Sequence, residues 1–188
     1  MRIVSIIILG IIVIVFFTSL NSFNTGKDII DYHLRSFYHA NIGHLLANAV
    51  SFYSLSFIEN IMGSPQFLLA MVFIWIVSSM LLYLYHLIVP SRKVYTVGFS
   101  AVIFGLIVIY FSLLNKSPGI TMVGLIISIL PQILVPGISY EGHICGVIAG
   151  ILYVLIFPVK KYSGKMAELS TSGSGGLGGL GSLFGSNK

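Results

Sequence analysis

An all-α membrane protein with six transmembrane helices is the architecture that this sequence predicts, and two features carry the prediction. The first is composition: of the 188 residues, 56% are hydrophobic and 8% are charged, and the mean hydropathy is +1.00. Soluble domains carry about a quarter charged residues, so a soluble protein is excluded. The second is that the apolar residues form runs near the roughly 17 to 25 residues that cross a bilayer as a helix.

The six predicted spans follow one another with mostly short connections. The first run follows Met1 and Arg2; it is longer than the core of a signal peptide, about 7–15 residues, and no small-x-small cleavage site follows it, so we expect a retained span. The fifth run is short and contains Pro131, which predicts a kinked, loosely held helix. The longest connection, residues 21–41, carries charges and is expected to be amphipathic and interfacial. The spans are residues 3–20, 42–62, 65–89, 95–114, 120–135 and 140–159.

Charge predicts the orientation and excludes one class of partner. Six spans place both termini on the same side of the membrane, and that side has a slight excess of Lys and Arg, which favours cytoplasmic termini under the positive-inside rule. The cations stand mostly at the ends of apolar runs, where they anchor helices, so the net charge of +5 predicts no nucleic-acid partner. We expect an integral, multi-pass protein in the lipid bilayer, and the sequence leaves the specific membrane open.

The chain divides into a transmembrane domain, residues 1–162, and a tail, residues 163–188. The tail is rich in glycine and serine, so we expect a flexible segment without a core. Cys145 is the single cysteine, which excludes an intramolecular disulfide and a cysteine-rich metal site. We expect Cys145 to be a small packing residue, and no cofactor or metal is predicted.

Three apolar runs begin with polar side chains, which are costly in a membrane and usually mark function. His44 and Asn48 begin the second run, Ser100 lies in the second turn of the fourth, and His143 begins the sixth. These three runs all start on the same side of the membrane. The four side chains should therefore lie at a similar shallow depth beneath one face, where they can meet if the helices pack together.

Ser100 is the candidate nucleophile, because a serine hydroxyl attacks once a base takes its proton, and a histidine can do so near neutral pH. His44, His86 and His143 all lie at a suitable depth. We favour His143 because glycines follow it, and such small residues let two membrane helices approach closely. His86 has no such glycines and is expected to be interfacial. The expected helix-packing residues are Gly105 on the fourth run and Gly146 and Gly150 on the sixth.

Two further side chains are suited to stabilise an oxyanion. His44 and Asn48 are four residues apart, so they share a helix face, and both donate hydrogen bonds. Ser100 lies near a helix N-terminus, where free N–H groups and the helix dipole favour a developing negative charge. The sequence does not place the carboxylates of Glu141 and Asp31 to orient a histidine, so we expect a Ser–His dyad rather than a triad.

Each of these residues, taken alone, has a common structural explanation. A serine in a membrane helix often bonds to a carbonyl one turn earlier, and His44 with Asn48 can join two helices. A transporter that binds a metal or ion through His39, His44 and His143 is a further alternative. Apart from Glu59, near the far end of the second run, no carboxylate lies deep enough in a predicted span to relay charge. The functional interpretation rests on the coincidence of polar residues at the starts of alternate spans.

These residues also form motifs, and through them the chain resembles the rhomboid intramembrane serine proteases. The motifs are His39 to Asn48, which fits His-x-x-x-x-His-x-x-x-Asn; Gly98 to Gly105, which fits Gly-x-Ser-x-x-x-x-Gly; and His143 with Gly146 and Gly150, which fits His-x-x-Gly-x-x-x-Gly. The resemblance implies an intramembrane serine endopeptidase. Its substrates would be single-span membrane proteins, cut where the helix is unstable and the residue before the cut is small.

The resemblance also implies a role for each site residue. Ser100 and His143 would form the catalytic dyad, and His44, Asn48 and the Ser100 backbone N–H would form the oxyanion hole. His39 would help to order water or the first loop. The fifth span would act as a lateral gate for substrate.

The chain departs from the family pattern at several points. The first loop is short and contains no Trp-Arg pair, Ala101 follows the serine where a glycine is frequent, and Phe104 stands where a tyrosine often stacks under the histidine. The alternative is a catalytically inactive rhomboid-like protein that binds client transmembrane helices. It would keep the fold and lose the dyad, so the presence of Ser100 and His143 argues against it. The oligomeric state is left open.

Overall fold

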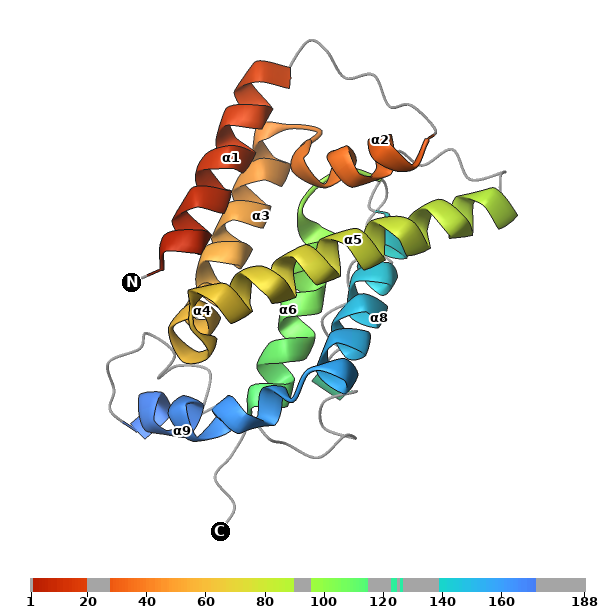
Figure 1. Cartoon of the computed structure of the whole chain (residues 1–188). Coiled ribbons are helices and arrows are strands. Elements are labelled where there is room, and N and C mark those ends of the chain that lie inside the picture. The colour runs from red at the N-terminus through yellow and green to blue at the C-terminus, as the bar shows by residue number, and fades with distance from the viewer. Residues whose placement is uncertain are drawn as a thin grey trace.

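The computed structural model describes residues 2–19, 28–89, 96–114, 123, 124, 126 and 139–171, and within these ranges every regular element is a helix (Figure 1). The all-helical part of the prediction is thereby confirmed. The elements are α1 (Ile3–Ser19), α2 (Ile29–Leu34), the 3-10 helix η1 (Arg35–Phe37), α3 (Ile42–Leu55), α4 (Phe57–Met62), α5 (Ser64–Ile88), α6 (Ser100–Leu113), α8 (Tyr140–Ile156), the 3-10 helix η2 (Val159–Tyr162) and α9 (Ser163–Thr171).

Membrane-spanning length is reached by fewer helices than the sequence predicts. Among the described residues, α5 is long and apolar enough to cross a membrane, and α8 reaches that length only together with η2 and α9, from which it is bent by 81°. The helices α1 and α6 are apolar but shorter. The predicted fifth span, residues 120–135, lies outside the described residues except at positions 123, 124 and 126. The number of six spans therefore stays a prediction.

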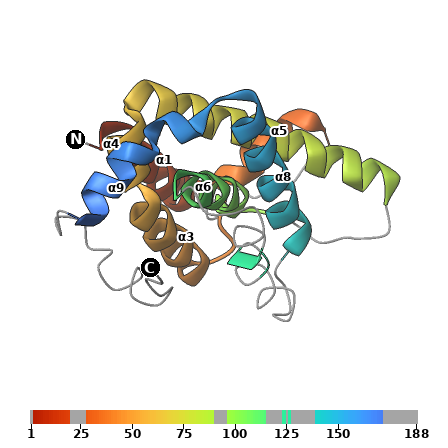
Figure 2. The same cartoon turned by 90° about the horizontal axis from the view of Figure 1, so that it is seen from below.

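The helix α6 runs through the centre of the molecule. In the view from below it is seen end-on, with α3, α5 and α8 around it (Figure 2). Val102, Leu106 and Ile109 of α6 are fully buried. A helix that is apolar on all sides is typical of a buried position, which explains why this segment carries so few polar residues.

Glycines allow α6 and α8 to touch through their main chains. A Cβ atom built on Gly146 would overlap the main chain of Ala101, and one on Gly150 would lie 2.7 Å from the carbonyl oxygen of Gly105, where ordinary contacts begin near 3.4 Å. No larger side chain fits between these helices without a shift. The contact holds the N-terminal ends of α6 and α8 side by side.

The first connection folds onto the bundle as α2 and η1, which pack beside α5. Asp28 caps α2, because its side chain accepts a hydrogen bond of 2.8 Å from the Asp31 N–H. On α5, Trp75 Nε1 donates to the carbonyl oxygen of His33 at 2.8 Å. Asp31 and Arg35, two of the charges that predicted an interfacial segment, are buried as an ion pair of 2.6 Å.

The second predicted span is divided at Ser56 into α3 and α4, and α4 carries a buried carboxylate. Glu59 accepts hydrogen bonds from the N–H groups of Val4 and Ser5 at 2.9 Å each and from the hydroxyls of Ser5 and Ser64 at 2.7 Å each. The two N–H groups belong to the first turn of α1, where no intrahelical acceptor exists. Glu59 therefore joins the start of α1 to the start of α5.

The first part of the predicted flexible tail, residues 163–188, is a helix in the structure. The helix α9 covers Ser163–Thr171, and its Met166 is buried in the same apolar core as Val159. This stretch contains the helix-favouring residues Lys, Met, Ala, Glu and Leu, and the run of glycines starts only after it. Residues 172–188 lie outside the described residues.

Candidate active site

Ser100 is the first residue of α6 rather than a residue of its second turn, so this detail of the prediction is wrong. The helix starts late because Gly98 has φ +106°, a left-handed conformation that glycine adopts without strain and that a helix does not contain. The N–H groups of the first turn of α6 have no intrahelical acceptor. The Ser100 hydroxyl therefore lies at the positive end of the helix dipole.

His143 lies in the first turn of α8, with its ring against Ser100. Its Nε2 atom is 2.9 Å from the Ser100 Oγ atom, a hydrogen-bond distance. The Phe104 ring stacks on the imidazole with ring centres 4.5 Å apart and an angle of 27° between the planes. The imidazole is buried, and its Nδ1 atom has no hydrogen-bond partner among the described residues. Within that part of the chain, the serine and histidine form a pair without a third member.

The glycine contact between α6 and α8 brings the pair together. Gly146 follows His143 by about one turn of α8, and Ala101, which Gly146 touches, follows Ser100 directly on α6. The closest approach of the two main chains is therefore one turn from the Ser–His hydrogen bond. A side chain at position 146 would separate the helices at this level.

His44 and Asn48 lie on one face of α3, beside the turn that precedes Ser100. A Cβ atom built on Gly98 would lie 2.7 Å from His44 Nε2 and 3.0 Å from Asn48 Nδ2, so both side chains contact this glycine. Asn48 is buried, and its Nδ2 atom has no hydrogen-bond partner in the described part of the chain. A buried donor without an acceptor is costly, and a negatively charged oxygen near Ser100 would satisfy it.

His39 lies next to His44, with ring centres 5.1 Å apart. Its Nδ1–H donates to the carbonyl oxygen of Phe37 at 3.2 Å. Burial, with a smaller contribution from the charge of His44, lowers the pKa of His39 to about 4, so the imidazole is neutral at neutral pH. Among the residues that the structure describes, no group of three or more His, Cys, Asp or Glu side chains is arranged to hold a metal ion.

Three other residues weighed from the sequence lie away from the dyad hydrogen bond. His86 is half-buried and shares a hydrogen bond of 2.7 Å with the Tyr32 hydroxyl, and its interfacial position stays a prediction. Cys145 is buried in a small apolar cluster that includes Tyr32. Glu141 is buried and accepts a hydrogen bond of 3.0 Å from the Ser139 hydroxyl.

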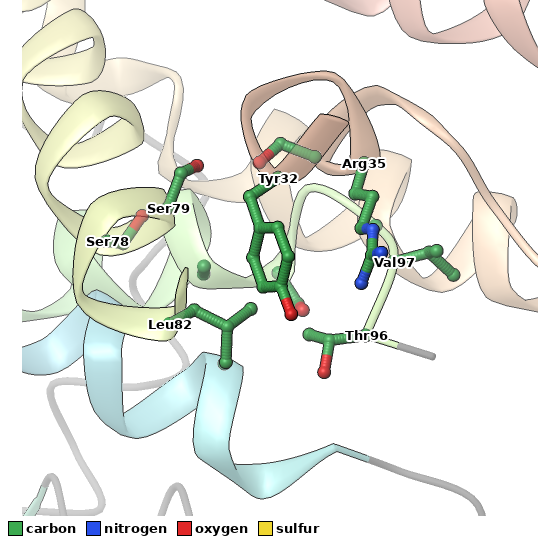
Figure 3. A pocket seen from close by; sticks show the side chains of 12 residues that line it. Tyr32, Arg35, Ser78, Ser79, Leu82, Thr96 and Val97 are labelled. Atoms are coloured by element: carbon green, nitrogen blue, oxygen red, sulfur yellow. The ribbon is translucent and has the colours of Figure 1, made fainter. Parts of the chain in front are cut away.

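A small pocket lined by both polar and apolar side chains reaches Ser100 from the side of α2, η1 and α5 (Figure 3). Its hydroxyl and guanidinium groups can hold water in an otherwise apolar protein. Sequence reasoning missed these residues, because they are scattered over separate segments and no spacing links them to the serine. The polar residues that line the pocket with Ser100 are Tyr32, Arg35, Ser36, Ser78, Ser79 and Thr96.

Comparison with known proteins agrees with the three motifs. The chain matches the Rhomboid domain family over residues 26–160. It is 59% identical over 163 residues to the "Putative rhomboid protein L523" of Acanthamoeba polyphaga mimivirus, which covers 87% of this chain and 95% of that protein. It is 31% identical over 147 residues to the "Rhomboid-like protein 14, mitochondrial" of Arabidopsis thaliana, and this match covers 68% of this chain and 43% of the plant protein. The chain therefore belongs to the rhomboid family of membrane proteins.

Proposed function

We propose that this protein is an intramembrane serine endopeptidase that cleaves transmembrane segments of membrane proteins. The observation that carries the proposal is the hydrogen bond of 2.9 Å between Ser100 Oγ and His143 Nε2. Nucleophilic catalysis by a serine requires a base within hydrogen-bond distance of its hydroxyl, and the helix N-terminus favours the negative charge that develops in the reaction. Membership of the rhomboid family supports the same activity.

The reaction is acyl transfer to water through a covalent intermediate. Ser100 Oγ attacks the carbonyl carbon of the peptide bond while His143 Nε2 takes the hydroxyl proton. The C–N bond then breaks, and His143 gives the proton to the leaving amine. A water molecule attacks the resulting ester with His143 again as the base, which releases the new carboxyl end and restores the serine.

The tetrahedral intermediate carries a negative oxygen that needs donors. Asn48 Nδ2 is buried beside Gly98 and has no other hydrogen-bond partner among the described residues. The His44 ring contacts the same glycine, and the Ser100 N–H belongs to the unpaired first turn of α6. These three donors form the proposed oxyanion hole, and the His39 ring meets the His44 ring edge to face.

The proposed substrates are single-span membrane proteins. A helical peptide bond is shielded by its neighbours, so the substrate must unwind locally, and glycine or proline near the cut makes this easier. Substrate would enter beside the predicted fifth span, of which only positions 123, 124 and 126 are among the described residues. Catalysis needs no cofactor in this scheme.

Reaction with a fluorophosphonate probe tests the proposal. Purified protein in detergent, with a chelator present, should be labelled, and both Ser100→Ala and His143→Ala should abolish labelling. Ser112→Ala is the matched control, because Ser112 lies near the other end of α6 with its hydroxyl bonded to the Val108 carbonyl oxygen at 2.9 Å.

Two results would count against the proposal. Folded wild-type protein that is not labelled would favour the alternative, an inactive rhomboid-like protein that binds client transmembrane helices. Labelling that survives Ser100→Ala would show that another residue is the nucleophile.

A further inference from the structure

A partly buried hydrogen bond joins the first connection to the C-terminal end of α5. The Tyr32 hydroxyl of α2 lies 2.7 Å from His86 Nδ1, and the two rings meet edge to face with centres 5.6 Å apart. Burial raises the pKa of the Tyr32 phenol above its usual value of 10, so the hydroxyl keeps its proton at neutral pH. This bond fixes α2 to a residue 54 positions further along the chain.

Arg35 links Tyr32 to the turn that precedes Ser100. Its guanidinium lies over the Tyr32 ring, 4.3 Å from the ring centre. Its main-chain carbonyl oxygen accepts a hydrogen bond of 3.0 Å from the Gly98 N–H. The two side chains lie next to each other in the wall of the pocket that reaches Ser100 (Figure 3). Arg35 therefore connects the Tyr32–His86 bond to the turn that precedes Ser100.

Gly98 is also the contact point for the two side chains of the proposed oxyanion hole. His44 and Asn48 both lie against its Cα atom, so closely that a Cβ there would meet them at 2.7 and 3.0 Å. Ser100 follows Gly98 by two positions. A displacement of the Arg35 main chain would therefore move Gly98 against both donors and would move the nucleophile as well.

We propose that Tyr32 and His86 are positioning residues for the hydrolytic reaction. Their hydrogen bond anchors α2 and η1 to α5, and the Arg35 main chain transmits this restraint to Gly98. The inference rests on the proposed function. Neither residue touches the reacting atoms. Their effect on rate is expected to exceed their effect on folding, because a misplacement of about 1 Å at a catalytic group costs on the order of 10²-fold in rate.

Tyr32→Phe tests the proposal, since it removes the hydroxyl and keeps the ring under Arg35. The saturation kinetics of fluorophosphonate labelling separate the maximal rate from the probe concentration at half-saturation. We expect the maximal rate to fall about tenfold, with the half-saturating concentration and the unfolding temperature nearly unchanged. Tyr83→Phe is the matched control, because the Tyr83 ring meets the Tyr32 ring edge to face at 5.4 Å, and it should label at the wild-type rate.

Substitutions of His86 test the same bond from the other side. His86→Leu should lose about as much rate as Tyr32→Phe, and His86→Gln, whose amide can bond the hydroxyl, should restore most of it. The double variant Tyr32→Phe/His86→Leu should be no slower than either single variant, because both remove one interaction.

Three outcomes would overturn the proposal. Tyr32→Phe protein that labels at the wild-type rate would show that the bond does not position the site. Losses that multiply in the double variant would show that the two residues act separately. Wild-type protein without Ser100-dependent labelling would refute the proposed function, and the positioning role with it. Labelling of the wild type therefore distinguishes failure of the proposed function from failure of the positioning role alone.

Discussion

Gly146 sets the distance between the two helices that carry the proposed dyad, so Gly146→Ala probes that geometry directly. An alanine Cβ at this position would lie 2.7 Å from the carbonyl carbon and 2.9 Å from the Cα atom of Ala101. The Ala101 carbonyl oxygen would lie closer still, and all three atoms are main chain and cannot rotate away. An ordinary contact begins near 3.4 Å, so α8 must move away from α6 by about 0.7 Å or more.

The dyad has little room for this movement. The Ser100–His143 hydrogen bond is 2.9 Å long, and such bonds rarely exceed about 3.2 Å. A misplacement of about 1 Å costs on the order of 10²-fold in rate, whereas overpacking costs typically about 1–3 kcal/mol in stability. We expect Gly146→Ala to lower the rate constant of fluorophosphonate labelling about 100-fold in protein that remains folded.

A glycine-to-alanine substitution at a position where the added Cβ meets no neighbour provides the control. A Cβ on Gly10 of α1 would meet nothing within 4 Å, so Gly10→Ala should label at the wild-type rate. It should also gain up to about 1 kcal/mol in stability, because alanine favours a helix over glycine. Thermal unfolding in detergent measures the stability of both variants. If Gly146→Ala protein labels as fast as wild type, the argument that this contact sets the dyad distance is refuted.

Three further predictions concern the oxyanion hole, the α1 anchor and pH. Asn48→Ala should lower the labelling rate about 10²- to 10³-fold with little change in unfolding temperature, because one oxyanion donor is lost; an unchanged rate would remove Asn48 from the hole. Glu59→Gln should lower the free energy of unfolding by about 1–3 kcal/mol, because one oxygen acceptor becomes a donor that faces donors. Glu168→Gln, at an exposed position of α9, should leave it nearly unchanged, and equal stability of the two variants would contradict the anchor. The pKa of His39 is lowered to about 4 in the folded protein, so as pH falls below about 6.5 the unfolded chain binds a proton at this residue before the folded protein does. The free energy of unfolding should therefore decrease by about 2 kcal/mol between pH 7 and pH 5. Thermal unfolding of wild type and His39→Gln across this range should show that the variant lacks this part of the loss, and parallel curves would contradict the assignment.

Local patterns explain why much of the candidate site was predictable. Ser100 and His143 were identified because each begins an apolar run, and the cost of a polar group in such a run does not depend on the partner helix. His44 and Asn48 were paired by their spacing on one helix. The start of α6 was missed by a few residues, because the left-handed conformation of Gly98 depends on the contacts of this turn with α3 and η1.

Other features depended on contacts that no local pattern encodes. Tyr32 and His86 were not connected from the sequence, because their hydrogen bond joins residues 54 positions apart. The helix α9 was assigned to the tail, because the glycine-rich composition of the whole segment masked its first nine residues, Ser163–Thr171. Burial of Met166 against the bundle then favours a helix there.

Composition and local pattern are enough to establish that the chain is a helical membrane protein and which polar residues stand at the starts of its helices. Both follow from the preference of each side chain for lipid or water and from the period of a single helix. That Ser100 and His143, 43 positions apart, lie at hydrogen-bond distance follows from the packing of the helices and not from any local pattern. That distance depends on how closely α6 and α8 approach and on their rotation, and a change of one residue in register turns a helix by about 100°. The contact of Gly146 with Ala101 fixes both quantities at once.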